Sequence, residues 1–187
     1  MKILQIIAKI ILKLWGWTLL DVPHRPPKAV VIAYPHTSNW DFPITLLALA
    51  ALPYHARWVG KDTMFKGMWG PVLRALGGVS VNRRERTGFV ERVVQEFTNR
   101  DVFNLVIAVE GTRKLQEGWK SGFYRIAIAA NVPVLLGVVD YSKKEVGLLD
   151  VVMLTGDEEA DIEHIATCYE GRKGHSHHNA SPIRLLK

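Results

Sequence analysis

Apolar and polar positions alternate along the chain in blocks that predict strands and helices in turn. Short runs rich in valine and isoleucine predict buried strands, and longer runs with one apolar face predict helices. Strands are expected at 29–34, 56–60, 79–81, 103–109 and 132–140, with 145–154 pairing near the last of them. Helices are expected at 42–52, 63–76, 87–100, 123–130 and 157–170. This alternation predicts a single α/β domain in which helices flank a mostly parallel sheet.

The first 20 residues form an apolar segment that lysines interrupt. Gln5, Lys9 and Lys13 are spaced by four residues, so they form one polar stripe on a helix. A membrane-spanning helix would bury each of the two lysines at a cost of about 2.5–3.5 kcal/mol, whereas a helix in the membrane surface keeps them among the headgroups. We therefore predict an amphipathic membrane-associating helix over 1–20. Packing of this helix on the domain's own core is the alternative.

The rest of the chain divides into an α/β domain over 21–170 and a C-terminal tail over 171–187. The tail contains His175, His177 and His178, but no cysteine or carboxylate is spaced to complete a metal site with them. We therefore expect a mobile tail and no metal. Within the segment 63–76, core packing is the expected role of the large apolar residues, and a place in the wall of a ligand pocket is the alternative: Met64, Phe65, Met68, Trp69, Val72 and Leu73.

Composition and charge narrow the class of protein. A chain of 187 residues with 48% hydrophobic content suits one domain with a sizeable core. The net charge of +6 points to anionic partners such as nucleic acid, phosphorylated ligands or an anionic membrane. No sequence signature of a nucleic-acid-binding fold is present, so we do not expect nucleic acid as a partner. The single cysteine, Cys168, excludes an internal disulfide and fits a reducing compartment.

Polar clusters follow three of the predicted strands: His36 to Asp41, Asn82-Arg83, and Glu110 to Arg113. Ligands of open α/β sheets bind beyond the carboxyl ends of the strands, so these clusters predict one site at that edge. A turn can bring His36 and Asp41 into contact, and the carboxylate then fixes the tautomer of the imidazole. The other ring nitrogen could take a proton from a substrate hydroxyl. The alternative is a surface loop in which Asp41 or Asn39 only caps the following helix.

Several residues of these clusters suit a phosphorylated ligand. The guanidinium groups of Arg83 and Arg113 match phosphate oxygens in bidentate geometry. Gly111 lets the backbone approach a ligand closely. Lys120 precedes a predicted helix start, where anions are favoured, and would be an accessory contact.

The order of these clusters resembles the glycerolipid acyltransferase family, which includes the 1-acylglycerol-3-phosphate acyltransferases. His36 and Asp41 match its first motif, a histidine and an aspartate separated by four residues. The segment 78–83 is similar to its second motif, 110–113 to its third and 132–134 to the start of its fourth. The resemblance covers residues 28–140 and also fits an N-terminus that works at a membrane.

The resemblance implies transfer of a fatty acyl group from acyl-CoA or acyl carrier protein to the hydroxyl of a lysophospholipid. The expected acceptor is 1-acylglycerol-3-phosphate, with other lysophospholipids or an acylated amino-acid lipid left open. His36 would act as the general base and Asp41 would orient it, in direct transfer without a protein nucleophile. Glu110 would position the acceptor or Arg113. Substrate binding is thus assigned to Arg83, Glu110, Gly111, Thr112, Arg113 and Lys120.

The same resemblance implies no cofactor beyond the acyl donor, and a peripheral location on the cytoplasmic face of a membrane. Two other functions remain open from the residues themselves. A thioesterase or lipid hydrolase could use the His36–Asp41 pair, although no Gly-x-Ser-x-Gly elbow is present. A non-catalytic module could bind anionic lipid through the N-terminal helix and the basic residues, but it would leave His36, Asp41 and Glu110 without a role.

Overall fold

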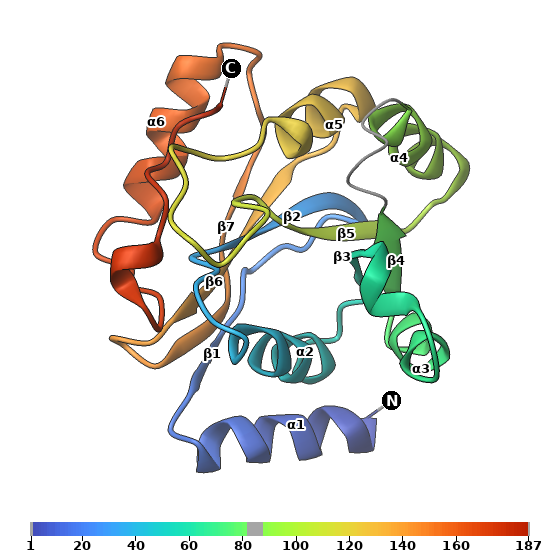
Figure 1. The fold of residues 1–187 in the computed structure, drawn as a ribbon, viewed down its shortest axis with the longest axis vertical. Coiled ribbons are helices and arrows are strands. Elements are labelled where there is room, and N and C mark those ends of the chain that lie inside the picture. Colours follow the sequence, from blue (N-terminus) through green and yellow to red (C-terminus); the bar gives the residue numbers. More distant parts are fainter. Residues whose placement is uncertain (1, 82–87, 187) are drawn as a thin grey trace.

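A computed structural model describes residues 2–81 and 88–186, and Figure 1 shows its arrangement of strands and helices. The seven strands form one sheet in the order β1-β7-β6-β2-β5-β3-β4. Their bounds are β1 Thr18–Leu20, β2 Lys28–Tyr34, β3 Arg57–Lys61, β4 Gly78–Val81, β5 Phe103–Ala108, β6 Val134–Asp140 and β7 Glu145–Val152. All neighbouring strands pair in parallel except β6 and β7, which are antiparallel.

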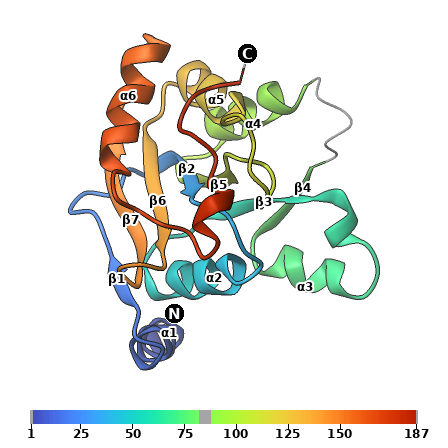
Figure 2. The same cartoon turned by 60° about the vertical axis from the view of Figure 1, so that its left-hand side comes forward.

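The helices cover both faces of this sheet. Their bounds are α1 Lys2–Leu14, α2 Asp41–Ala51, η1 Asp62–Phe65, α3 Trp69–Ala75, α4 Phe89–Asn99, α5 Gly122–Ala130, α6 Glu158–Cys168 and η2 His177–Asn179. Helices α2 and α3 lie on one face and α4, α5 and α6 on the other, while α1 lies outside α2 (Figures 1 and 2). The predicted fold class is confirmed.

The valine- and isoleucine-rich segments form strands because they are buried from both sides. On β2, Val30 and Ile32 face the core beneath α4 and α5, whereas Ala29 and Val31 face the core beneath α2. A strand covered on both faces shows a continuous apolar run, as expected for a parallel sheet. The other strands and helices expected from the sequence are present, apart from two segments. The helix expected over 1–20 ends at Leu14, because a turn at Gly16 with φ of 75° leads into β1.

The segment 63–76 differs from its prediction. It splits into η1 and α3, and of its large apolar residues Phe65 is buried. Met64, Met68, Trp69 and Val72 are exposed, so the expectation of core packing is wrong for these four.

Helix α1 packs one side on α2 and leaves the other side uncovered. Ala8 and Leu12 are buried in a cluster that includes Ile44 and Ala48 of α2. The outward-facing apolar residues are Ile3, Leu4, Ile6, Ile7, Ile10 and Leu14. Packing on the domain's own core is therefore confirmed for the side of α1 that carries Ala8 and Leu12, and the membrane contact of the other side stays a prediction. Among the helices of the described residues, none combines the length and the apolar character that crossing a bilayer requires.

The C-terminal segment packs against the carboxyl-end edge of the sheet. The backbone N–H of Tyr141 donates to the carbonyl of Lys173, and Leu185 forms a parallel bridge with Trp119. Ser181 is fully buried. The expectation of a mobile tail is thus wrong for residues 171–186.

Candidate active site

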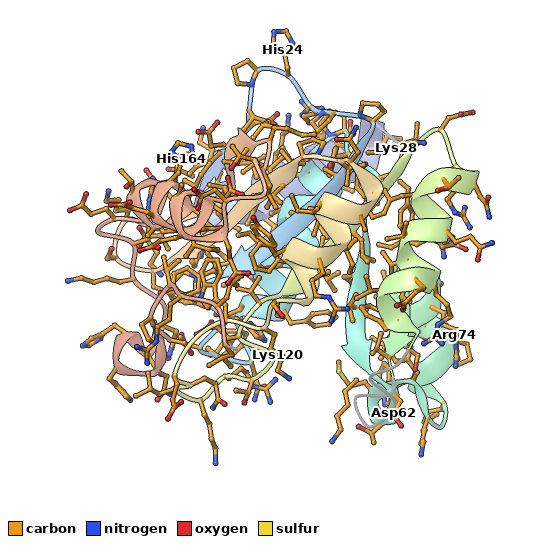
Figure 3. All side chains as sticks on the ribbon, turned by 90° about the horizontal axis from the view of Figure 1, so that it is seen from above. His24, Lys28, Asp62, Arg74, Lys120 and His164 are labelled. Carbon is orange, nitrogen blue, oxygen red and sulfur yellow. The ribbon has the colours of Figure 1, made fainter. Side chains whose placement is uncertain are left out.

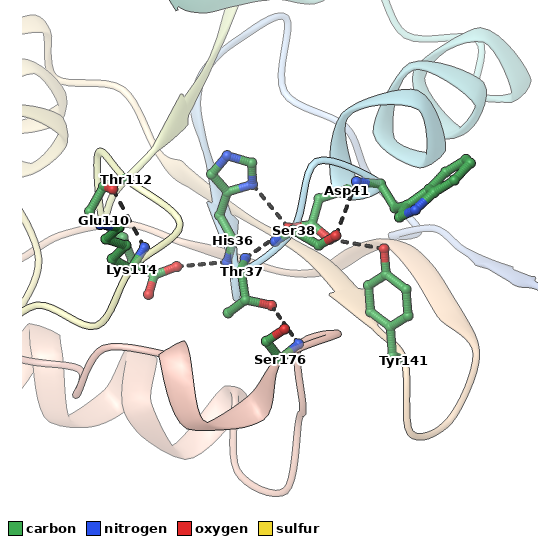
Figure 4. Close-up of polar contacts among 10 residues, drawn as sticks. His36, Thr37, Ser38, Asp41, Glu110, Thr112, Lys114, Tyr141 and Ser176 are labelled. Atoms are coloured by element: carbon green, nitrogen blue, oxygen red, sulfur yellow. Dashed lines mark hydrogen bonds and ion pairs between the residues drawn. The ribbon is translucent and has the colours of Figure 1, made fainter.

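The His36–Asp41 contact is the centre of the site. The turn between β2 and α2 brings Nδ1 of His36 within 3.1 Å of Oδ2 of Asp41, as Figure 4 shows. With Nδ1–H donated to the carboxylate, Nε2 carries the lone pair and can accept a proton. His36 also lines a cavity, which makes this nitrogen available to a bound ligand.

Asp41 is held by donors on both of its oxygens. Oδ2 accepts hydrogen bonds of 2.8 Å from the backbone N–H groups of Thr37 and Ser38. Oδ1 accepts a 2.9 Å hydrogen bond from the hydroxyl of Tyr141, which follows β6. Burial, and then the nearby charge of Asp41, raise the pKa of the Tyr141 phenol, so it remains a donor. The carboxylate orients the histidine loop and does not cap α2, whose N-cap residue is Trp40 with no side-chain hydrogen bond.

Glu110 joins the histidine loop to two other parts of the chain. It follows β5, and its Oε2 accepts a 2.6 Å hydrogen bond from the backbone N–H of His36. Oε1 accepts a 2.8 Å hydrogen bond from the backbone N–H of Ser181. The side chain is 1% exposed, and loss of solvation raises its pKa more than these two donors lower it. The sequence-based role for Glu110, contact with the acceptor or Arg113, is therefore replaced by a role in holding the backbone.

The C-terminal segment also contacts the loop between His36 and Asp41. The backbone N–H of Ser176 donates to Oγ1 of Thr37 at 3.2 Å. A Cβ on Gly174 would lie 2.5 Å from the same oxygen, so only glycine fits against this loop. The ring of His175 packs edge-on against Tyr141, with 5.0 Å between centroids. Three consecutive residues of the C-terminal segment thus pack against the loop and the tyrosine that hold Asp41 beside His36.

A cavity of about 400 Å³ opens beside His36. Its polar side is formed by His36, Asp41, Lys61, Thr112 and Arg113. Its apolar wall comes from α2, the strands and η1: Phe42, Leu46, Leu49, Trp58, Val59, Met64 and Val106. A volume of this size accommodates a small organic ligand or part of a lipid. The many apolar side chains of the lining suit an acyl chain, and Lys61 and Arg113 suit an anion.

Comparisons with known proteins identify a family for the chain and a solved structure with a similar fold. The model of the protein family described as "Acyltransferase" matches residues 21–136. The chain belongs to this acyltransferase family. The fold is similar to the crystal structure of the 1-acyl-sn-glycerophosphate (LPA) acyltransferase PlsC from Thermotoga maritima, with a TM-score of 0.57 and 15% identity. That match covers 89% of this chain and 75% of the other. No curated protein matches the chain significantly.

Two of the three polar clusters expected from the sequence lie together at the cavity. Gly111, Thr112 and Arg113 of the third motif line it together with His36 and Asp41 of the first. Gly111 has φ of 66°, and a Cβ there would lie 2.7 Å from Cε of Lys120. Lys120 therefore covers Gly111 at the carboxyl-end edge, opposite Lys28 at the start of β2 (Figure 3). Asn82 and Arg83 of the second motif lie outside the described residues.

Three features of this acyltransferase site were not assigned from the sequence. Tyr141 lies about 100 residues from Asp41, so no local pattern connects them. Ser181 acts through its backbone N–H, which any residue other than proline would supply. Lys61 ends β3 and lines the cavity. In the sequence, only its position at the carboxyl end of a predicted strand could have indicated that Lys61 lies at the site.

A second group of polar side chains lies elsewhere in the fold. The ligand atoms of Asp150, His164 and Cys168 lie within 4.8 Å of one another, on the surface formed by β7 and α6. Figure 3 places His164 away from Lys120 and the carboxyl-end edge.

Proposed function

We propose that this acyltransferase moves a fatty acyl group from acyl-CoA or acyl carrier protein to the hydroxyl of 1-acylglycerol-3-phosphate, giving phosphatidate. The observation that carries the proposal is the position of the His36–Asp41 pair at a cavity that is lined by many apolar side chains and also by Arg113. The similarity in fold to an LPA acyltransferase supports the choice of acceptor. Family membership supports the reaction class.

The reaction is a direct transfer. Nε2 of His36 takes the proton of the acceptor hydroxyl while the oxygen of that hydroxyl attacks the thioester carbonyl. The tetrahedral intermediate then collapses, the C–S bond breaks, and the imidazolium returns the proton to the departing thiolate. Asp41 keeps the ring in the required tautomer and stabilises the transient imidazolium. The proposed chemistry requires no metal and no cofactor besides the donor thioester.

The basic and the apolar residues that line the cavity are proposed to bind different parts of the substrates. Arg113 is proposed to bind the acceptor phosphate, with Lys61 beside the same cavity as a second cation. Arg83 and Lys120 remain proposed phosphate contacts from the sequence. The apolar wall built by α2 and β3 is proposed to hold an acyl chain. Glu110 has no direct part in this binding because backbone amides occupy its oxygens.

The N-terminal helix is proposed to hold the enzyme peripherally on the cytoplasmic face of a membrane. Its outer side is apolar, and Lys9 and Lys13 are exposed at positions suited to headgroups. Both the acceptor and the product of the proposed reaction are membrane lipids. A surface helix would therefore keep the cavity near its substrates.

The proposed function is tested by measuring release of free thiol from palmitoyl-CoA and from palmitoyl-acyl carrier protein, each with and without lysophosphatidate. The expected result is thiol release only when the lipid is present, with phosphatidate as the labelled product. Release without the lipid would replace the proposal by a thioesterase. No release with either donor, while the protein still binds anionic vesicles, would favour the lipid-binding module. A panel of other lysolipids identifies the acceptor if lysophosphatidate is poor.

A further inference from the structure

Helix α3 presents an apolar face to the outside of the molecule. Trp69, Val72 and Leu76 are spaced by three and four residues, so they share one side of the helical turn, and all three are exposed. Met68 immediately before the helix is 84% exposed, and Trp69 is 66% exposed. Together with Met64 of η1 these residues form what we call the α3 patch. A contiguous apolar surface of this kind on a soluble domain marks an interaction site.

Buried residues on the inner side of η1 and α3 hold the patch in its orientation. Phe65 is buried and stacks on Trp58 of β3, with ring centroids 5.6 Å apart. A Cβ on Gly70 would lie 2.2 Å from the carbonyl oxygen of Phe65, so α3 approaches η1 closely. Leu73 packs inward against the same cluster. The outward direction of the patch is therefore set by packing from within.

The patch continues into the cavity of the candidate site. Met64 lines the cavity and is also exposed to solvent, so one side chain belongs to both surfaces. Lys61 and Thr63 line the cavity beside it. An apolar ligand that leaves the patch would thus meet the apolar wall of the cavity without first crossing open solvent.

Exposed lysines lie on both of the helical segments that carry outward-facing apolar residues. Lys61 and Lys66 adjoin the patch, and Lys9 and Lys13 lie on α1. The segment 61–76 contains one acidic residue, Asp62, against Lys61, Lys66 and Arg74. Helices α1 and α3 lie on the same side of the sheet and flank α2 in both views (Figures 1 and 2). Apolar side chains among basic ones match a bilayer surface that carries anionic headgroups.

We propose that the α3 patch and the outer face of α1 form one docking surface for an anionic lipid bilayer, with the mouth of the cavity between the bilayer and His36. The α3 patch is thus a second membrane contact besides α1. A second copy of this chain fits less well, because the lysines of two such surfaces would repel each other. The docking itself is independent of the reaction, whereas delivery of lipid to His36 rests on the proposed function.

The test compares two double variants of the full chain by flotation with vesicles. Met68→Ser/Trp69→Ser removes the centre of the patch. Leu115→Ser/Met153→Ser is the matched control, because Met153 is 53% exposed and Leu115 is also exposed, both outside the patch. Vesicles of phosphatidylcholine alone and with phosphatidylglycerol are used. Thermal unfolding checks both variants, and thiol release is measured with a short-chain thioester and a monomeric lysolipid in the absence of vesicles.

The expected result is a partition coefficient about tenfold or more lower for the patch variant on anionic vesicles, with the control unchanged. Binding of wild type to phosphatidylcholine alone should be weaker than to the anionic vesicles. Turnover of the soluble substrates should be the same in all three proteins. Wild-type vesicle binding by the patch variant would overturn the proposal. Absence of turnover in wild type, with docking still dependent on the patch, would instead overturn the proposed function.

Discussion

The backbone N–H of His36 donates a 2.6 Å hydrogen bond to Oε2 of Glu110, so the buried side chain of Glu110 joins the loop after β2 to the segment after β5. The other oxygen of the same carboxylate accepts from Ser181 of the C-terminal segment. A single buried side chain therefore fixes the start of the histidine loop and the tail that covers it. We therefore expect Glu110 to influence turnover through the position of the loop that carries His36.

Replacement of Glu110 by Gln should reduce both stability and turnover. The amide offers one acceptor oxygen, and its NH₂ group would face the second backbone N–H. The free energy of unfolding should fall by about 1–3 kcal/mol, because a buried donor loses its partner. Thermal unfolding and kcat measure the two effects. Wild-type stability and turnover in this variant would show that Glu110 does not hold the histidine loop in place.

The stability difference between wild type and Glu110→Gln should also depend on pH. Burial raises the pKa of Glu110 in the folded state above its ordinary value of 4.5. The folded protein then holds this proton more tightly than the unfolded chain, so the stability contributed by Glu110 is complete below 4.5 and declines as pH rises through the folded-state pKa. Urea unfolding of both proteins from pH 4 upward, at roughly half-unit steps, measures this slope. A difference that increases with pH would contradict the account.

Tyr141→Phe should lower kcat about tenfold with little change in KM. The hydroxyl of Tyr141 holds Oδ1 of Asp41, and its loss lets the carboxylate and the ring of His36 move from the productive orientation. The matched control is Tyr124→Phe, which removes a 2.8 Å hydrogen bond to the buried Asp161 and leaves the site untouched. Both variants should lose similar stability, about 1–2 kcal/mol. Equal kcat values in the two variants would show that Tyr141 is only structural.

Arg113→Ala should mainly raise the KM for the phosphorylated acceptor. A charge-assisted hydrogen bond contributes about 1.5–3 kcal/mol, which corresponds to a KM about 10- to 100-fold higher. Arg125→Ala is the control, because Arg125 is exposed on α5. Steady-state kinetics with lysophosphatidate varied at a fixed donor concentration measure the effect. An unchanged acceptor KM would exclude Arg113 as a phosphate contact.

Gly174→Ala should lower turnover although residue 174 lies far from His36 along the chain. The added Cβ would lie 2.5 Å from Oγ1 and 2.9 Å from Cγ2 of Thr37, so the histidine loop or the tail must shift. Overpacking of this kind costs about 1–3 kcal/mol of stability. Gly122→Ala is the control, since a Cβ there meets nothing within 4 Å. If the turnover of Gly174→Ala equals that of Gly122→Ala, the contact between the tail and the histidine loop is not needed for catalysis.

The sequence predicted the sheet because each central strand is buried on both sides and so carries an unbroken apolar run. It also brought His36, Asp41, Thr112 and Arg113 to one edge, since parallel strands share that edge. It did not predict the contacts of the tail, which are made by backbone groups of residues such as Ser176 and Ser181. Backbone donors leave no mark in the residue pattern, and the tail histidines suggested a solvated segment.

The error at α3 has a different cause. The spacing of Trp69, Val72 and Leu76 indicates an amphipathic helix, but periodicity does not show which way the apolar side faces. Packing of Phe65 on Trp58 decides that direction, and it depends on residues from another strand.

The most direct test of the account is thiol release from acyl-CoA in the presence of lysophosphatidate, compared between wild type, His36→Ala and His24→Ala. His24 is exposed at the opposite side of the molecule from Lys120 and the carboxyl-end edge (Figure 3), so its loss should leave turnover unchanged. Loss of the general base should lower kcat of His36→Ala by about 10²–10⁴-fold, with the fold retained. Full lysophosphatidate-dependent thiol release by His36→Ala would contradict the account.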